Sequence, residues 1–265
     1  MAVGPAPRQD EYFDDLEVMA PEAREEHLNR GLRQAVEHAY RSAPAARDLL
    51  DGAKVSPSDI RTAKDLERLP ITRKTDLIEM QRARPPYGGF LAVPVEDVER
   101  VFISPGPIYE PLHGAAIKWF ARSFHAAGFR KGDVVVNTFT YHMSPAGMLF
   151  HEALRDCGAT VVVMGTGNTD VQVQTMRDLR VNGFVGTPSF LMTLIKRVEE
   201  LGHDFRRDFA LERAWFTGEM LSGTVRGTLE DEYGIATAQA YAVTEPGGAL
   251  AYECSHKSGM HLMDD

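Results

Sequence analysis

Apolar residues recur at helical spacing near the start of the chain. Within residues 11–50, the positions Leu28, Leu32 and Val36 fall on one face of a helix, and charged residues fill the remaining face. This pattern predicts a packed amphipathic helix, ended by Pro44. Further on, two polar clusters and one longer segment are typical of helix starts, at 56–59, 62–65 and 69–77.

From residue 98 onward, short apolar runs alternate with longer segments of helical spacing. The runs indicate strands at 98–103, 133–138, 160–164, 183–186, 213–217 and 237–242, and the longer segments indicate helices at 118–127, 146–156, 171–179, 188–201 and 221–233. Such alternation predicts an α/β fold, with largely parallel sheets flanked by helices. The continuous apolar runs 134–136 and 161–164 fit strands covered on both faces. We therefore divide the chain into an N-terminal helical region, residues 1–94, and an α/β core, residues 95–265.

Composition narrows the functional classes. The chain has 265 residues, of which 43% are hydrophobic and 25% charged, as in ordinary globular proteins. The net charge of −9 is opposite to that of a general nucleic-acid or anionic-membrane binder. No run approaches the roughly 20 apolar residues of a membrane span, and the N-terminus does not resemble a secretory signal. With only two cysteines, Cys157 and Cys254, a cytoplasmic location fits best.

Open α/β sheets bind ligands at the carboxyl ends of their strands. This rule points to the loops 103–111, 139–147, 165–170, 186–189, 217–222 and 241–248. A phosphate cradle in the first loop would need glycines, hydroxyls and usually a lysine. Residues 104–111 offer only Ser104 and Gly106, carry Glu110, and include prolines that remove backbone donors. From its residues alone, this segment is a stiff turn and a poor phosphate site.

Two other loops have residues suited to chemistry. Residues 139–147 combine aromatic, thioether and small side chains, which suit a pocket for an apolar or aromatic acid about as well as simple packing. In the loop 241–248, the hydroxyl of Thr244 and the carboxylate of Glu245 can serve a phosphate and its Mg²⁺. A Thr-Glu pair alone is commonplace.

Near the end of the chain, Cys254, His256 and His261 form a partial set of zinc ligands. Three ligands are too few for a closed structural site, so a fourth would have to come from elsewhere. The short ligand list favours the alternative, a polar loop without metal.

Taken in order along the chain, these segments resemble the N-terminal part of the phenylacetate–CoA ligase-like branch of the adenylate-forming (AMP-binding) superfamily. The resemblance is carried by an ordered series of motifs at 38–44, 65–77, 101–111, 128–135, 167–169, 187–190, 218–220, 241–245 and 253–261. No single motif is decisive. The resemblance rests on the order and spacing of the motifs over almost the whole chain.

The resemblance implies a chemistry and a set of residues. The family activates a carboxylic acid with ATP to an acyl-adenylate, and CoA then displaces AMP. By resemblance, Thr244 contacts the adenylate phosphate and Glu245 holds Mg²⁺. The implied nucleotide-binding residues are Ser104, Gly106, Gly218, Glu219, Met220 and Tyr241. The implied pocket for the acid, expected to be aromatic, is formed by Tyr141, His142, Ala146 and Gly147.

Two departures from the family pattern stand out. Glu110 takes the place of the lysine of the phosphate loop, and two like charges 4 Å apart repel by roughly 4 kcal/mol at an effective dielectric of 20. The chain also stops at Asp265, before the family's C-terminal domain with its catalytic lysine. The expectation is an incomplete ligase with little or no adenylation, acting as a homodimer or with a separate chain that supplies the missing domain. The alternative is a non-catalytic binding or regulatory module derived from the same fold.

Overall fold

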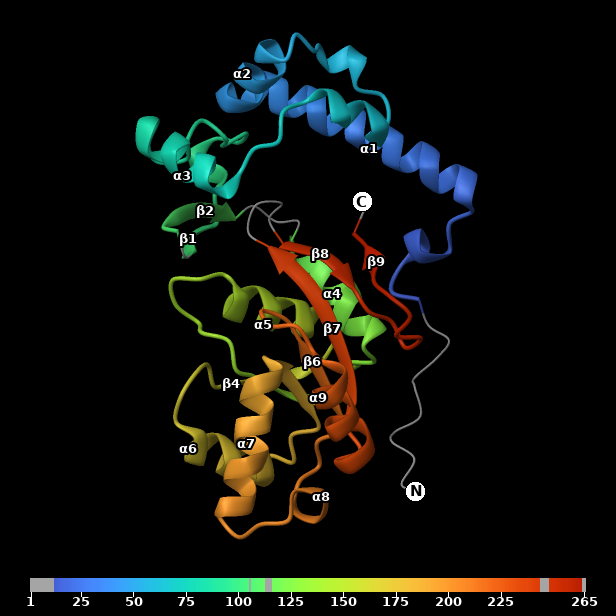
Figure 1. The fold of residues 1–265 in the computed structure, drawn as a ribbon, viewed down its shortest axis with the longest axis vertical. Helices are drawn as coiled ribbons and strands as arrows, with labels where there is room; N and C mark the ends of the chain where they lie inside the picture. Colours follow the sequence, from blue (N-terminus) through green and yellow to red (C-terminus); the bar gives the residue numbers. More distant parts are fainter. Residues whose placement is uncertain (1–11, 105, 113–115, 244–247, 264–265) are drawn as a thin grey trace. The chain divides into compact units, whose positions relative to one another are not determined.

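The computed structural model describes residues 12–104, 106–112, 116–243 and 248–263. The chain divides into two compact units (Figure 1), of which one is formed by residues 14–114 and the other mainly by residues 115–263.

The first unit is mostly helical and carries a small β-hairpin. Its elements are η1 (Asp15–Val18), α1 (Pro21–Ser42), α2 (Pro44–Gly52), η2 (Pro57–Asp59), η3 (Ala63–Arg68), α3 (Lys74–Ala83), η4 (Val95–Asp97), β1 (Arg100–Ser104) and β2 (Ile108–Leu112). The predicted face of α1 is partly buried at Leu28, Leu32 and Val36. As predicted, α1 ends before Pro44, at Ser42. Pro44 then begins α2, because a proline at the first helical position lacks only an N–H that has no partner there.

The helix starts predicted at 56–59 and 62–65 are confirmed, as short 3₁₀ turns. In the first, a carboxylate oxygen of Asp59 accepts a hydrogen bond of 2.8 Å from the backbone N–H of Ser56. In the second, Asp65 accepts one of 2.8 Å from the N–H of Thr62. Each aspartate satisfies a backbone donor at the start of its turn.

The second unit is an α/β structure. Its elements are α4 (Ala116–Ala126), β3 (Val134–Asn137), α5 (Ala146–Asp156), β4 (Thr160–Val163), α6 (Thr169–Asp178), β5 (Gly183–Gly186), α7 (Pro188–Glu200), α8 (Phe205–Asp208), β6 (Arg213–Phe216), α9 (Gly223–Gly227), η5 (Thr228–Glu232), β7 (Ala236–Val243), β8 (Gly248–Tyr252) and β9 (His261–Leu262). The seven-stranded sheet has the order β4-β3-β5-β6-β7-β8-β9. Its first five strands pair in parallel and the last two are antiparallel, so the predicted largely parallel sheet is confirmed.

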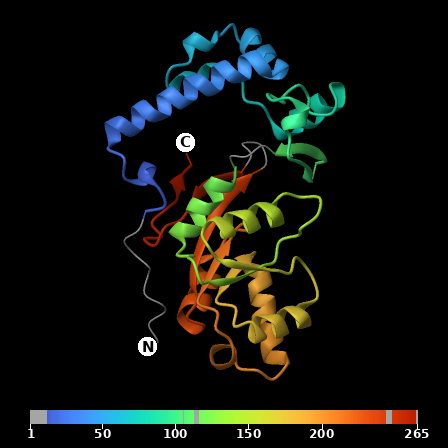
Figure 2. The same ribbon diagram turned by 180° about the vertical axis from the view of Figure 1, so that it is seen from behind.

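Helices cover this sheet on both faces, as the two opposite views show (Figures 1 and 2). Side chains alternate between the faces along each strand. On one face, Trp215 of β6 packs its ring 4.6 Å from that of Phe124 in α4 and 5.1 Å from that of Phe150 in α5. On the other face, Val136 and Phe184 belong to a buried cluster with residues of α6 and α7.

One prediction about burial is wrong. The run 134–136 lies in β3, an inner strand, where Val135 and Val136 are buried as predicted. The run 161–164 instead falls on β4, at the edge of the sheet, where the side chain of Val163 is 56% exposed. Both runs are apolar, and hydropathy alone does not distinguish an inner strand from an edge strand.

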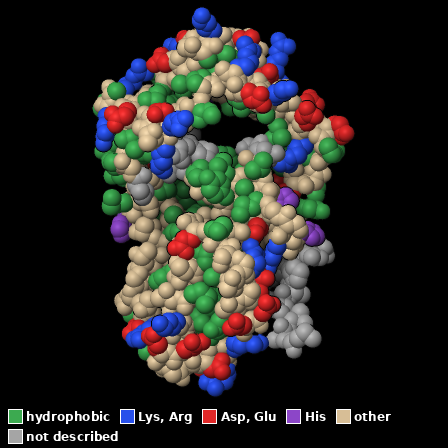
Figure 3. All heavy atoms as spheres, in the orientation of Figure 1, with side chains coloured by type: hydrophobic (Ala, Val, Ile, Leu, Met, Phe, Trp, Pro, Cys, Tyr) green, Lys and Arg blue, Asp and Glu red, His purple; other side chains and the backbone are tan. Residues whose placement is uncertain are grey.

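No helix in the part of the chain that the structure describes is long and apolar enough to cross a membrane. On the face drawn in Figure 3, Lys and Arg side chains are interspersed with Asp and Glu side chains. That face therefore offers no broad basic surface of the kind that nucleic acid requires.

A buried hydrogen bond anchors the aromatic cluster, and it yields a prediction. The indole N–H of Trp215 donates to the hydroxyl of Ser123 at 2.8 Å, and both side chains are fully buried. Ser123→Ala leaves that N–H without a partner, so we expect the free energy of unfolding to fall by about 1–3 kcal/mol. Urea unfolding measures it. Ser258→Ala, at an exposed serine, is the control and should change stability by less than about 0.5 kcal/mol.

Candidate functional site

Three loops meet at the carboxyl edge of the parallel strands. They follow β3, β5 and β6. A Cβ atom added to Gly218 would lie 3.7 Å from Cγ2 of Thr187 and 4.0 Å from Cε1 of Phe139. Gly218 itself has a φ of +83°, a conformation that favours glycine. The edge where the ligand-binding rule places a site is thus built from one residue of each loop.

A hydrogen-bonded pair joins two of these loops. The carboxylate of Glu219 accepts a bond of 2.8 Å from the hydroxyl of Ser189 and one of 3.3 Å from its backbone N–H. Ser189 lies in the first turn of α7, where Thr187 is the N-cap. Two further residues predicted for the nucleotide site, Met220 and Tyr241, have exposures of 84% and 56%. Apolar side chains of this size that stand open at a strand edge are available to a planar ligand.

The residues predicted for the acyl pocket differ in their exposure and in the element to which they belong. His142 is exposed, whereas Tyr141 is partly buried. Ala146 and Gly147 belong to the first turn of α5. A Cβ atom on Gly147 would lie 2.2 Å from the carbonyl oxygen of Thr140, so only glycine allows the loop to lie directly on the helix.

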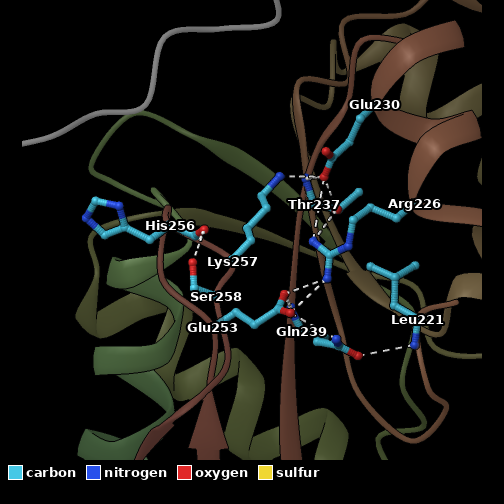
Figure 4. A network of polar contacts seen from close by, with 9 residues as sticks. All are labelled: Leu221, Arg226, Glu230, Thr237, Gln239, Glu253, His256, Lys257 and Ser258. Carbon is cyan, nitrogen blue, oxygen red and sulfur yellow. Dashed lines mark hydrogen bonds and ion pairs between the residues drawn. The ribbon is translucent and has the colours of Figure 1, made fainter. Parts of the chain in front are cut away.

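A network of polar contacts supports the loop after β6 (Figure 4). The carboxylate oxygens of Glu253 both accept hydrogen bonds of 2.8 Å from Arg226. Glu253 also accepts bonds from the backbone and side chain of Gln239, at 3.1 and 3.0 Å. The side-chain oxygen of Gln239 in turn accepts the N–H of Leu221 at 3.2 Å. Leu221 directly follows Met220, so the network fixes the end of the predicted adenine-binding segment.

A second carboxylate extends this network. Glu230 accepts hydrogen bonds from the hydroxyl of Thr237 and from Lys257, the latter at 2.5 Å, and its carboxylate lies 3.7 Å from Arg226. Burial of Glu230 acts to raise its pKa, but the bonds from Lys257 and Thr237 outweigh it and lower the pKa below the ordinary 4.5. Glu230 therefore stays ionised over a wider pH range.

The three candidate zinc ligands are not brought together. Among the described residues, no group of three His, Cys, Asp or Glu side chains could hold a metal ion. His256 is exposed and its ring points away from the network (Figure 4). The ring of His261, in β9, lies 5.4 Å from that of Tyr252. Cys254 is partly buried.

The segment 104–111 is not the loop that its residues predict. Ser104 ends β1, Gly106 lies in a turn, and the following residues form β2, which pairs with β1 in a separate two-stranded antiparallel sheet. Backbone N–H and C=O of Tyr109 both bond to the side chain of Gln81, each at 2.9 Å. Pro111 is tolerated because each strand of a two-stranded sheet has an edge without a neighbour. The segment is therefore part of a separate small sheet in the first unit and not a strand-end loop of the main sheet.

Two predicted residues, Thr244 and Glu245, lie outside the described residues. Three residues for which the sequence indicated no role bond to the candidate loops. They are Asn137, Gln239 and Ser189. Asn137 ends an apolar run, so a polar residue at a strand end was the available signal. For Gln239, whose partners come from distant segments, the sequence holds no comparable signal.

No protein-family model matches the chain. The structure of a 2-hydroxyisobutyryl-CoA ligase in complex with 2-HIB-AMP and CoA superimposes with a TM-score of 0.89 and 25% identity, over 97% of this chain and 58% of that one. The sequence is 32% identical to the phenylacetate-coenzyme A ligase of Pseudomonas putida, over 96% of this chain and 58% of that protein. The enzyme of the same name from Thermus thermophilus is 31% identical, over 96% of this chain and 58% of its own length.

The fold and the sequence similarity define the class, which is that of the adenylate-forming CoA ligases. Within it, the chain is a relative of the phenylacetate–CoA ligases. It spans less than three fifths of the length of these relatives, 58% in each case.

The lowered pKa of Glu230 predicts a pH-dependent stability difference. Because the folded pKa is below the ordinary value, ionised Glu230 stabilises the fold above pH 4.5, and this contribution is lost as the pH falls through the lowered pKa. We expect Glu230→Gln to unfold more easily than the wild type at pH 7, by about 1.5–3 kcal/mol. The two proteins should converge in acid. Urea midpoints across this range measure the difference, with Glu232→Gln as the control at an exposed glutamate.

Proposed function

We propose that the chain forms the acyl-adenylate-binding part of a carboxylic acid–CoA ligase. The observation that carries this proposal is the convergence of Phe139, Thr187 and Gly218 at the carboxyl edge, with Met220 and Tyr241 exposed in the predicted adenine segment. A relative with this fold was solved with an acyl-adenylate, 2-HIB-AMP, and with CoA. The same site here would hold the adenine against the 218–220 segment and the acid against the 139–147 loop.

The residues present suit an adenylate. Because Gly218 has no side chain, the space that a Cβ atom would fill, in van der Waals contact with Thr187 and Phe139, is available to a flat base that approaches the backbone. Ser189 holds Glu219 at the rim of that space. The names of the relatives support an aromatic acid as the substrate, and the ring of Tyr141 suits one.

ATP would supply the adenylyl group, Mg²⁺ would offset charge as pyrophosphate leaves, and CoA would accept the acyl group. The proposed Mg²⁺ ligand, Glu245, lies outside the described residues. The relationship to the ligases favours this function over a non-catalytic module derived from the same fold.

Ligand binding tests the proposal directly. A ligand that binds only the folded chain raises its stability by about 2.7 kcal/mol at 100 times Kd, which corresponds to roughly 5–10 °C in the unfolding midpoint. We expect such a shift with AMP and with phenylacetyl sulfamoyl adenosine, a stable analogue of the acyl-adenylate. No shift with either ligand would contradict the proposal.

A matched pair of variants localises the binding. Glu219→Ala removes the carboxylate that bonds Ser189 at the start of α7, and we expect it to weaken AMP binding by about tenfold, equivalent to 1.4 kcal/mol. Glu199→Ala removes an exposed carboxylate that accepts a bond from Tyr233 near the other end of the same helix. This control should bind AMP as the wild type does, and calorimetry measures both.

The segment 104–111, which by resemblance corresponds to the family's phosphate loop, yields a prediction about nucleotide length. Tyr109 has its backbone donor engaged by Gln81, and residues 105, 107 and 111 are prolines without a donor. We therefore expect ATP to bind no more tightly than AMP. Glu110→Lys should not change this ratio, since it frees no backbone N–H. A gain of ATP affinity or of ATP–pyrophosphate exchange in Glu110→Lys would show that charge alone had blocked the triphosphate.

A further inference from the structure

One buried amide organises the whole loop 139–147. Asn137 is the last residue of β3, and its side chain is fully buried. Its Nδ2 donates to the carbonyl oxygen of Gly147 and to the hydroxyl of Tyr141, both at 2.9 Å. Its Oδ1 accepts the N–H of Phe139 at 3.1 Å. The beginning, middle and end of the loop are thus bonded to a single side chain.

This arrangement determines where the hydroxyl of Tyr141 points. The hydroxyl oxygen accepts a bond from a fully buried donor, so it faces the interior. It also lies 3.4 Å from Nδ1 of His151, on the second turn of α5, which can accept a hydrogen bond from the phenol. Burial raises the pKa of Tyr141 to about 12, so the phenol stays neutral at ordinary pH. Its donor and acceptor capacity is directed toward Asn137 and His151.

The loop has little freedom to turn this hydroxyl outward. The backbone of Thr140 lies so close to α5 that a Cβ on Gly147 would come within 2.2 Å of its carbonyl oxygen. Phe139, at the start of the loop, packs its ring 4.9 Å from that of Phe150. Rotating Tyr141 would require breaking a bond to Asn137 while both ends of the loop remain fixed.

We propose that Asn137 is a positioning residue that turns the Tyr141 hydroxyl inward and leaves the ring as the wall of the acyl site. The site would then accept an acid with an apolar substituent in preference to the same acid carrying a hydroxyl. The inference rests on the proposed function, in which the 139–147 loop contacts the acyl group. Its physical basis is that a hydroxyl buried against an aromatic ring loses its water and gains no partner.

Two ligands that differ by one hydroxyl test the proposal. They are phenylacetyl sulfamoyl adenosine and its mandelyl counterpart, which adds a hydroxyl beside the carbonyl. AMP, which has no acyl group, is the reference. By calorimetry, the wild type should bind the phenylacetyl analogue about 10–100-fold more tightly than the mandelyl analogue, the range available to an apolar pocket that excludes a hydroxyl.

Asn137→Ala should reduce this preference to about threefold or less, because a freed phenol can turn toward the ligand and serve its hydroxyl. Its affinity for AMP should stay within about twofold of the wild type, which a general loss of structure would not allow. Asn182→Ala is the matched control. Asn182 bonds the backbone of Val134 at 2.8 Å and Asp133 at 2.9 Å, at the opposite end of β3, so the variant loses comparable bonds away from the loop. It should retain the preference.

Tyr141→Phe provides a second variant should Asn137→Ala fail to fold. The hydroxyl that it loses faces Asn137 and not the ligand, so the preference for the phenylacetyl analogue should persist even if both affinities fall. Loss of the preference in Tyr141→Phe, or equal binding of the two analogues by the wild type, would overturn the inference and leave the proposed function standing. If neither analogue nor AMP binds the wild type, the proposed function fails and the inference falls with it.

Discussion

Burial of the parallel strands on both faces is the constraint on which the α/β unit depends. The inner strands β3, β5 and β6 pack one set of side chains against α4 and α5 and the alternate set against α6 and α7. Neither face is left for a ligand. Polar chemistry is therefore confined to the strand ends, and the parallel direction gathers those ends at one edge. Phe139, Thr187 and Gly218 come together for this reason.

The contact between Arg226 and Glu253 shows how buried polar groups hold the loop after β6 in place. Glu253 is 6% exposed, so its charge is acceptable only because Arg226 and Gln239 supply donors to both of its oxygens. Removing one partner would leave a buried charge uncompensated. The same carboxylate fixes Gln239, whose side chain holds Leu221. Stability and the placement of the predicted adenine segment are thus coupled through one group.

Much of the secondary structure could be predicted from the sequence. Periodicity gives α5 and β5 at the predicted bounds, since a continuous apolar run between turns suits an inner strand and amphipathic spacing suits a covering helix. Periodicity does not predict features that depend on which strands lie next to one another in the sheet. Whether the run 160–164 lies inside the sheet or at its edge depends on strand order, which no local pattern encodes.

The same distinction explains what could be predicted of the site. Gly218 and Glu219 were identifiable because their motif lies in one stretch of chain. The hydrogen bond between Glu219 and Ser189 joins residues far apart in sequence, and so does the bond between Tyr109 and Gln81. No local motif indicates such pairs. The strand β2 was missed because the prolines of the segment 104–111 suggested a turn, while its pairing with β1 depends on the hairpin as a whole.

Side-chain amides hold several loops of the α/β unit in place. Among the described residues, side-chain amides bond to loops, by Asn137 to residues 139–147, by Gln172 to the carbonyl oxygens of Gly165 and Gly167 and by Gln239 to Leu221. Gln81 bonds in a similar way to Tyr109 of strand β2. An amide both donates and accepts, so it can satisfy backbone groups of opposite sense without introducing a charge. A carboxylate in the same position could accept but not donate, and its bonds would change with pH. The amides therefore give these loops a fixed geometry that is independent of pH, whereas the carboxylates Glu230 and Glu253 depend on their basic partner Arg226.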